Sequence, residues 1–307
     1  MKILLTGATG FLGSHIAEEL IENGHDLILT KRQSSNLWRC ESFVNKVYWV
    51  NTDSKSWIKE TLKFCPEIII NSAWNGVSAG NREEWGTQVE NINFQQQLLE
   101  LASNVKLKRF IGIGSQAEYG EFHERIDETF LPNPSTAYGA TKLAASIILS
   151  TFCNTHQIGW YWFRLFSCFG ERESENWLIP ATIKNILTKD SMDLTPGEQE
   201  YSYMYIKDVA RFILTAVEST AQSGIYHIAA DKCRTLKEIL NFIKDYLNPQ
   251  FKLNFGALPY RIGQSMINAS FIDKTTTAFG KIDPSDFKEK LIQTIEYYKQ
   301  NINNEKK

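Results

Sequence analysis

The sequence predicts a protein of the α/β class, built on a doubly wound parallel sheet and completed by a smaller C-terminal lobe. Two observations predict the sheet. Short continuous runs of Ile, Leu and Val alternate with segments whose apolar residues recur at helical spacing, as in a parallel sheet covered on both faces. A glycine-rich turn joins the first run to the first helical segment, as in a Rossmann fold. A third observation predicts the lobe: after Gly170 the loops lengthen and the strand-like runs become short and isolated.

The first strand and helix are the clearest predicted elements. Residues 2–6 form a short apolar run, and the glycine-rich turn follows it. Leu12, Ile16 and Leu20 then recur at helical spacing, until an Asn-Gly pair ends the helix. This strand, turn and helix begin the sheet.

The same alternation continues along the chain and sets the domain organisation. Further buried strands are predicted at residues 27–29, 47–50, 68–70, 109–113 and 160–166. Helices are predicted at residues 55–64, in a long segment that ends near Ala102, and at residues 137–155. We therefore expect residues 1–170 to form the sheet domain and residues 171–307 mainly the lobe, with some segments returning to the sheet.

Charge and composition exclude several classes of partner. The 307 residues carry a net charge of −2 without any Lys- or Arg-rich run, so nucleic acid and membrane surfaces are not expected partners. No stretch approaches the ~20 consecutive apolar residues of a membrane span, and the N-terminus does not form a signal peptide. We therefore expect a cytoplasmic protein. Its five widely spaced cysteines predict reduced thiols and no metal site.

The glycine-rich turn predicts a dinucleotide site. Gly7, Gly10 and Gly13 have the spacing G-x-x-G-x-x-G between the first strand and the first helix. Glycines permit the tight turn and the close approach of backbone amides to a pyrophosphate, and the helix N-terminus favours negative charge. The cofactor-binding residues predicted in this turn are Gly7, Thr9, Gly10, Phe11, Leu12 and Gly13.

The end of the second strand favours NADP over NAD. An acidic residue there would hydrogen-bond the adenosine ribose of NAD, whereas a cation accommodates the 2′-phosphate of NADP. This strand ends in Thr30, Lys31 and Arg32, with no carboxylate. We therefore predict that Lys31 and Arg32 bind NADP(H), although a solvated basic loop would have the same sequence.

A serine, a tyrosine and a lysine form the predicted catalytic set. Tyr138 and Lys142 lie one turn apart at the start of a predicted helix, so that an ammonium group can approach the phenol and lower its pKa. Ser115 ends the fifth strand at the sheet edge where ligands bind. A second Tyr-x-x-x-Lys pattern, at Tyr203 and Lys207, has no such serine upstream and is interpreted as a core strand.

At these residues the chain resembles the extended short-chain dehydrogenases/reductases, the NAD-dependent epimerase/dehydratase family, and within it the nucleotide-sugar 4-ketoreductases. The resemblance covers nearly the whole length and implies further cofactor-site residues, namely Asp53 near adenine, Ala73, Asn91 and Phe166. It also implies that the lobe binds a nucleotide sugar. A homodimer interface is implied for the helices near residues 83–102 and 137–155, which would otherwise be ordinary sheet-covering helices.

Departures from the family pattern narrow the expected reaction. Dehydratases carry an acidic pair directly after the serine, where this chain has Gln116 and Ala117. Epimerising reductases carry a Cys and a His at the positions of Ala117 and Trp177. The remaining Ser, Tyr and Lys suffice for hydride transfer at a single carbon.

A 4-epimerase and a 4-ketoreductase both fit these departures, and Lys31 and Arg32, in place of the acidic residue usual in NAD-retaining epimerases, favour the second: NADPH-dependent reduction of the C4 ketone of a nucleotide-activated 4-keto-6-deoxyhexose, a dTDP- or CDP-sugar. One alternative is a nucleotide-sugar 4-epimerase with retained NAD. An alternative of another class is a catalytically silent dinucleotide-binding sensor or scaffold.

Substrate contacts are predicted at three residues. Gln116 follows the catalytic serine, while Asn176 and Arg261 match family positions that contact the sugar diphosphate. A guanidinium is well shaped for pairing with a diphosphate. Many relatives carry a further arginine where this chain has Tyr201, so this part of the nucleotide site differs from theirs.

Overall fold

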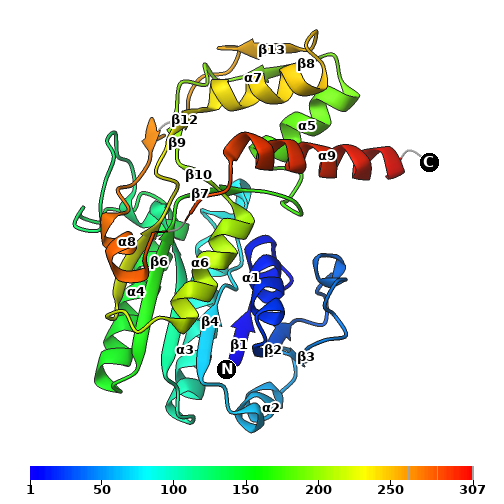
Figure 1. Ribbon diagram of the computed structural model, residues 1–307. Coiled ribbons are helices and arrows are strands. Elements are labelled where there is room, and N and C mark those ends of the chain that lie inside the picture. Colours follow the sequence, from blue (N-terminus) through cyan, green and yellow to red (C-terminus); the bar gives the residue numbers. More distant parts are fainter. Residues whose placement is uncertain (262, 282, 306–307) are drawn as a thin grey trace.

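The computed structural model describes residues 1–261, 263–281 and 283–305, and its centre is a parallel sheet of seven strands (Figure 1). The strand order is β11-β6-β5-β4-β1-β2-β3, which is the expected doubly wound arrangement. The strands are β1 (Lys2–Thr6), β2 (Asp26–Lys31), β3 (Tyr48–Asn51), β4 (Ile68–Asn71), β5 (Arg109–Ser115), β6 (Gly159–Leu165) and β11 (Gly224–Ile228).

Strand β1 shows why the apolar runs are continuous. Leu4 pairs with Ile28 of β2 on one side and with Ile69 of β4 on the other. Side chains alternate between the two faces of the sheet, so Leu4 and its neighbours Ile3 and Leu5 enter different hydrophobic clusters. Because helices cover both faces, every one of these positions is buried.

The helices divide between the two faces (Figure 1). α1 (Phe11–Glu22) and α6 (Ile206–Glu218) share the cluster that contains Ile3 and Leu5. The opposite cluster contains Leu4 and is covered by α2 (Trp57–Phe64), α3 (Trp85–Ser103) and α4 (Ala137–Thr155). Both α6 and β11 come from beyond residue 170, so the chain returns to the sheet after entering the lobe.

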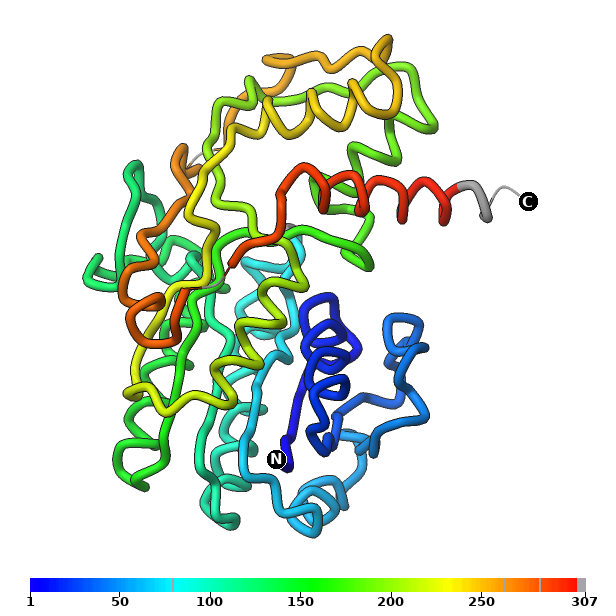
Figure 2. The backbone as a smooth tube through the Cα atoms, viewed as in Figure 1, coloured from blue at the N-terminus to red at the C-terminus, as the bar shows by residue number. Residues whose placement is uncertain are grey.

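The lobe lies beyond the carboxyl ends of the strands, with a core of its own (Figures 1 and 2). Its helices are α5 (Leu178–Thr188), α7 (Leu236–Leu247) and α9 (Phe287–Glu305), whereas α8 (Asp273–Phe279) packs on the sheet domain, with Phe279 against Tyr226 of β11. Its short strands are β7 (Ser167–Phe169), β8 (Ser191–Leu194), β9 (Glu200–Tyr201), β10 (Tyr203–Tyr205), β12 (Arg234–Thr235), β13 (Lys252–Phe255) and β14 (Ile267–Asn268). They form three small sheets, β10-β7, β12-β9-β14 and β13-β8.

The second Tyr-x-x-x-Lys pattern lies where strand and helix meet. Tyr203 is on β10 and its ring contacts Phe169 of β7 at 6.3 Å between centroids, whereas Lys207 lies on the exposed side of α6. The strand expected through this region is divided, because Ser202 is buried and its amide donates to the carbonyl of Asn268. Tyr203 is thus a partly buried aromatic residue that packs against the lobe core.

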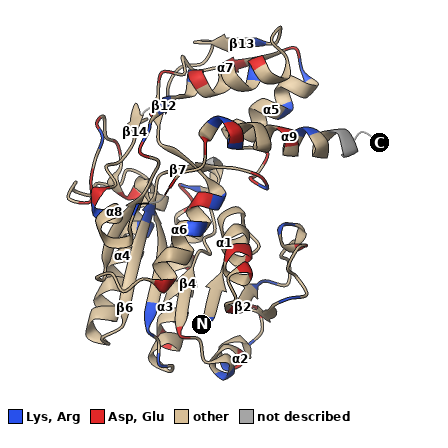
Figure 3. Ribbon diagram, in the orientation of Figure 1, with Lys and Arg blue, Asp and Glu red and all other residues tan. Residues whose placement is uncertain are grey.

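Acidic and basic residues are interspersed over the helices of both parts (Figure 3). In the ranges that the structure describes, no helix combines the length and the apolar character that crossing a membrane requires.

Candidate active site

The glycine turn forms a cradle that side chains would fill. Gly7 has φ +74°, and a Cβ there would lie 2.6 Å from the amide nitrogen of Ala73. A Cβ on Gly13 would lie 2.1 Å from the carbonyl oxygen of Gly7. Helix α1 starts at Phe11, directly after Gly10, and no side chain caps its N-terminus. These features fit a pyrophosphate lying against the turn and the helix end.

A cavity of about 410 Å³ extends from this cradle along the carboxyl ends of the strands. It is lined by eight predicted cofactor residues, Gly7, Thr9, Gly10, Lys31, Arg32, Asp53, Ala73 and Asn91. Phe11, Leu12 and Gly13 form the first turn of α1 beside it. Phe166 lies elsewhere, packed against Phe122 and His227 in a separate aromatic cluster.

The two cations at the end of β2 face a corner of this cavity. Arg32 is exposed, and Lys31 is half-buried with its Nζ 5.9 Å from the ring of Trp49. Asp53 lies beside them and accepts a hydrogen bond from the amide of Gln33 at 2.7 Å. Within the described residues, Lys31, Arg32 and Asp53 form no ion pair, so both cations are available to a bound anion.

Asn91 fixes the loop that follows β4. Its side chain accepts from the amide of Asn75 at 2.7 Å and donates to the carbonyl of the same residue. Gln88, one turn earlier on α3, accepts from the indole of Trp74 and donates to the carbonyl of Gly76. This network fixes Trp74 in the lining of the cavity, and no sequence pattern indicated this residue.

The predicted catalytic residues converge at the carboxyl end of β5. Ser115 ends this strand, and Tyr138 and Lys142 lie in the first two turns of α4, whose N-cap is Thr136. All three catalytic side chains are buried. The backbone amide of Tyr138 donates to the carbonyl of Arg82 at 2.9 Å, so the loop after β4 is tied directly to the catalytic helix.

The electrostatics around Tyr138 differ from the expectation in one respect. Burial raises the pKa of Tyr138, and the Arg82 charge and a hydrogen bond with Ser115 oppose this rise. The Cζ of Arg82 lies 4.8 Å from the centre of the Tyr138 ring, whereas the Nζ of Lys142 lies 6.0 Å from it. The cation closest to the phenol ring is therefore Arg82, which the sequence analysis missed because no motif marks its loop.

Lys142 is held by other partners. Its Nζ donates to the carbonyl of Ile113 at 2.6 Å and lies 3.7 Å from the ring centre of Trp74. Burial lowers the pKa of Lys142 to about 7, and the negative charge of Glu118 opposes this decrease.

A buried ion pair lies behind the catalytic serine. Glu118 is fully buried and accepts hydrogen bonds from the amide of Ser115 at 2.9 Å, the indole of Trp162 at 2.9 Å and the guanidinium of Arg164 at 2.7 Å. Arg164 also donates to the hydroxyl of Tyr119. These bonds fix the turn that carries Ser115.

The three predicted substrate residues differ in exposure. Gln116 is half-buried beside Ser115, while Asn176 and Arg261 are exposed on lobe segments. The ring of Trp177 lies 5.7 Å from the Cζ of Arg82. The charges of Arg261 and Arg82 also act on the phenol of Tyr201, whose pKa is raised by burial.

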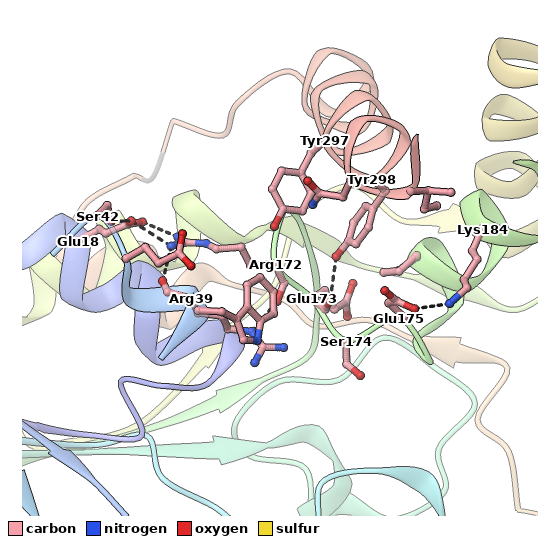
Figure 4. Close-up of a pocket in the computed structure, with 15 residues that line it drawn as sticks. Glu18, Arg39, Ser42, Arg172, Glu173, Ser174, Glu175, Lys184, Tyr297 and Tyr298 are labelled. Atoms are coloured by element: carbon pink, nitrogen blue, oxygen red, sulfur yellow. Dashed lines mark hydrogen bonds and ion pairs between the residues drawn. The ribbon is translucent and has the colours of Figure 1, made fainter. Parts of the chain in front are cut away.

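A second cavity, of about 900 Å³, is lined by other residues (Figure 4). It separates α1 and the turn η1 (Trp38–Cys40) from the lobe helices α5 and α9. Ion pairs form between side chains of its wall, Arg172 with Glu18 and Lys184 with Glu175. The second cavity therefore marks the junction between the sheet domain and the lobe.

Comparisons with known proteins agree with this architecture. The model of the NAD dependent epimerase/dehydratase family matches residues 3–229. The CDP-abequose synthase of Salmonella muenchen is 27% identical over 284 residues, which cover 89% of this chain and 91% of that protein. The dTDP-6-deoxy-L-talose 4-dehydrogenase (NAD(+)) of Aggregatibacter actinomycetemcomitans is 24% identical over 273 residues, covering 87% and 98%.

A solved structure shows the same fold. The UDP-glucose 4-epimerase of Thermotoga maritima, determined with UDP-glucose, superposes with a TM-score of 0.88 at 23% sequence identity. The superposition covers 98% of this chain and 100% of that chain.

Proposed function

The chain belongs to the NAD dependent epimerase/dehydratase family, and from this premise we propose that it uses NADPH to reduce the C4 ketone of a nucleotide-activated 4-keto-6-deoxyhexose, a dTDP- or CDP-sugar. One observation carries the proposal: Lys31 and Arg32, and no acidic residue, stand at the end of β2 at the cavity, which favours NADPH over a retained NAD. Gln116 and Ala117 follow Ser115, where dehydration would need an acidic pair. Ser115, Tyr138 and Lys142 suffice for hydride transfer at one carbon. The names of the two curated relatives, a CDP-abequose synthase and a dTDP-6-deoxy-L-talose 4-dehydrogenase, support a nucleotide-sugar substrate.

Each group of the site has a separate task in this reaction. The nicotinamide, when bound, supplies the hydride for C4. Tyr138 donates its proton to the carbonyl oxygen, and the hydroxyl of Ser115 hydrogen-bonds the same oxygen. Lys142 holds the nicotinamide ribose, and Lys31 with Arg32 binds the 2′-phosphate on the adenosine side.

The lobe residues complete the proposed site. Asn176 and Arg261 bind the sugar diphosphate, and Gln116 contacts the sugar beside Ser115. Asn176 and Arg261 are both exposed and therefore accessible to a substrate that enters from solvent.

The test is consumption of NADPH with a dTDP- or CDP-4-keto-6-deoxyhexose. We expect the wild-type chain to oxidise NADPH in proportion to the ketone added. The Tyr138→Phe variant should lose about 10²- to 10⁴-fold in turnover, because the proton donor is removed, while it still binds NADPH. Binding of NADPH without turnover by the wild-type chain would instead identify a silent dinucleotide-binding protein.

A 4-epimerase is the second candidate, because a solved UDP-glucose 4-epimerase shares the fold over 98% of this chain. An epimerase restores its cofactor in each cycle, so it would interconvert C4 epimers of a nucleotide sugar without consuming NADPH. Protein that is purified with tightly retained NAD and leaves added NADPH intact would exclude the reductase.

A further inference from the structure

Arg82 is built into the active site through both its backbone and its side chain. Its carbonyl accepts the amide hydrogen bond of Tyr138, and its Nε donates to the carbonyl of Val77 at 3.0 Å. The guanidinium is thereby directed over the Tyr138 ring at 4.8 Å, with the ring of Trp177 at 5.7 Å. An arginine between two aromatic rings has little freedom to leave this position.

No acidic side chain neutralises Arg82 in the part of the chain that the structure describes, since none of the ion pairs there includes it. Its positive charge is therefore available to the groups in contact with it. A cation over the face of an aromatic ring is attracted by the ring electrons, and the attraction increases when the site is shielded from water. Tyr138 is buried, so this condition is met.

The other charges near Tyr138 do not replace Arg82. Lys142 lies farther from the ring and directs its Nζ to the carbonyl of Ile113. Glu118, on the turn after β5, is negative and acts in the opposite direction. Ser115 contributes a hydrogen bond but no charge. Arg82, with its Cζ 4.8 Å from the ring centre, is thus the cation placed to act on the phenol.

We propose that Arg82 is a positioning residue of the active site, whose guanidinium stabilises the negative charge that Tyr138 carries after it gives its proton to the substrate oxygen. In this step the O–H bond of Tyr138 breaks and a new O–H bond forms on the C4 oxygen, which the hydride has made negative. The inference rests on the proposed function, because that function makes Tyr138 the proton donor.

Ionisation of Tyr138 can be measured without substrate. Tyrosinate absorbance is recorded by stopped-flow pH jump, before alkaline unfolding, and the signal of Tyr138→Phe is subtracted to isolate Tyr138. Arg82→Met should raise the midpoint of this titration by on the order of one pH unit. Arg82→Lys, which keeps the charge but loses the planar contact, should give an intermediate midpoint.

Lys237→Met is the matched control, because Lys237 is exposed on the lobe and its Nζ lies 5.3 Å from the Phe255 ring. It removes the same charge from an aromatic contact outside the active site and should leave the midpoint unchanged. An unchanged midpoint in folded Arg82→Met and Arg82→Lys would overturn the proposal.

Turnover separates this inference from the proposed function. In NADPH-dependent reduction, Arg82→Met should move the alkaline limb of the pH profile of kcat to higher pH, by the same amount as the titration midpoint of Tyr138. The KM for the keto sugar should stay within a few-fold of the wild-type value. A raised KM with an unmoved alkaline limb would identify Arg82 as a substrate-binding residue and overturn the inference. If the midpoint moves but no keto sugar is reduced, the effect on the phenol stands and the proposed reaction fails.

Discussion

At the scale of single residues, the cationic side chains of the candidate site are of two kinds: some lack an ion-pair partner among the described residues and one is paired with a buried carboxylate. Lys31 and Arg32 face the cofactor cavity without an ion-pair partner in the described chain, whereas Arg164 is held by Glu118. Lys31 and Arg32 are therefore available to bind an anionic ligand, whereas Arg164 stabilises the fold. Removing a charge should affect ligand binding in the first case and the free energy of unfolding in the second.

The cations at the end of β2 should determine the preference for NADPH. Replacing Lys31 and Arg32 together by alanine should raise the KM for NADPH by about 10- to 100-fold, because charge-assisted hydrogen bonds to the 2′-phosphate are lost. The KM for NADH should change little, since NADH lacks this phosphate. Steady-state kinetics with both cofactors provides the test, and Lys59→Ala on the exposed side of α2 is the control. An equal rise in the KM for NADPH and for NADH would contradict the assignment of Lys31 and Arg32 to the 2′-phosphate.

The Glu118–Arg164 pair should behave as a coupled structural unit. Glu118→Gln should lower the free energy of unfolding by about 3–5 kcal/mol, because it leaves the guanidinium of Arg164 buried without its counter-charge. The double variant Glu118→Gln with Arg164→Met should lose less free energy of unfolding than the two single variants lose together. Urea denaturation of the four proteins measures this cycle, and strictly additive losses would refute the coupling.

At the scale of elements, the position of Ser115 depends on how closely its turn packs against α4. A Cβ on Gly139 would lie 2.2 Å from the carbonyl oxygen of Ala117, so Gly139→Ala must separate the turn from the helix. We expect kcat to fall at least about tenfold, since small displacements of catalytic groups are costly. Gly86→Ala is the control, because a Cβ there meets open space. Comparable kcat values for the two variants would show that this close packing is unimportant.

The same elements show what the sequence can predict. Six of the seven strands of the sheet were predicted closely, and helix Ala137–Thr155 was predicted with its bounds, because local periodicity and burial coincide there. Strand β11 (Gly224–Ile228) was not predicted, because it lies among the irregular segments after Gly170. Arg82 and Trp74 were not predicted. They lie in a loop whose course is set by side chains of α3 such as Asn91 and Gln88, and these long-range contacts leave no periodic pattern.

The lobe was predicted only from the longer loops and the short, isolated apolar runs that follow Gly170. Its strands are two to four residues long, too short for an alternating pattern to distinguish them from loops. The predicted site positions Asn176 and Arg261 depended on family resemblance, and their contacts with substrate remain a prediction.

At the scale of the whole molecule, we propose that α3 and α4 form a homodimer interface. Both helices expose large apolar side chains, Val89 on α3 and Ile147 on α4, which a monomer would leave in water. Ile147→Lys should therefore shift the mass in sedimentation velocity from dimer to monomer. Leu131→Lys changes an equally apolar exposed residue in a loop and should leave the mass unchanged. A monomeric wild-type chain would contradict the interface.

Two buried histidines attach the segments beyond residue 170 to the sheet domain. His15 on α1 lies between the carbonyl of Glu171, 3.0 Å from its Nε2, and the guanidinium of Arg172, 2.7 Å from its Nδ1. His227 on β11 contacts Tyr119 and Ser270 through its two ring nitrogens. Burial, followed by the nearby arginine charge, lowers the pKa of His15 to about 4 and that of His227 to about 3.

The attachment by His15 should therefore weaken in acid. The unfolded chain takes up a proton near pH 6.5, and the folded chain does so only near pH 4, so the free energy of unfolding falls as the pH decreases between these values. The contribution of His15 is roughly 3 kcal/mol. Burial raises the pKa of Glu173 to about 8, and its protonation stabilises the fold in part of the same range, so the wild-type curve alone mixes opposite effects.

The difference between wild type and His15→Gln isolates the histidine. Glutamine occupies the site without titrating. In urea denaturation from pH 7 to pH 4, the free energy of unfolding should therefore fall less for the variant than for wild type, by most of the roughly 3 kcal/mol that His15 contributes. His123→Gln, at an exposed histidine, should follow the wild-type curve. Parallel curves for wild type and His15→Gln would mean that His15 is protonated as readily in the folded chain as in the unfolded one, and that its contact with Arg172 does not depend on a neutral ring.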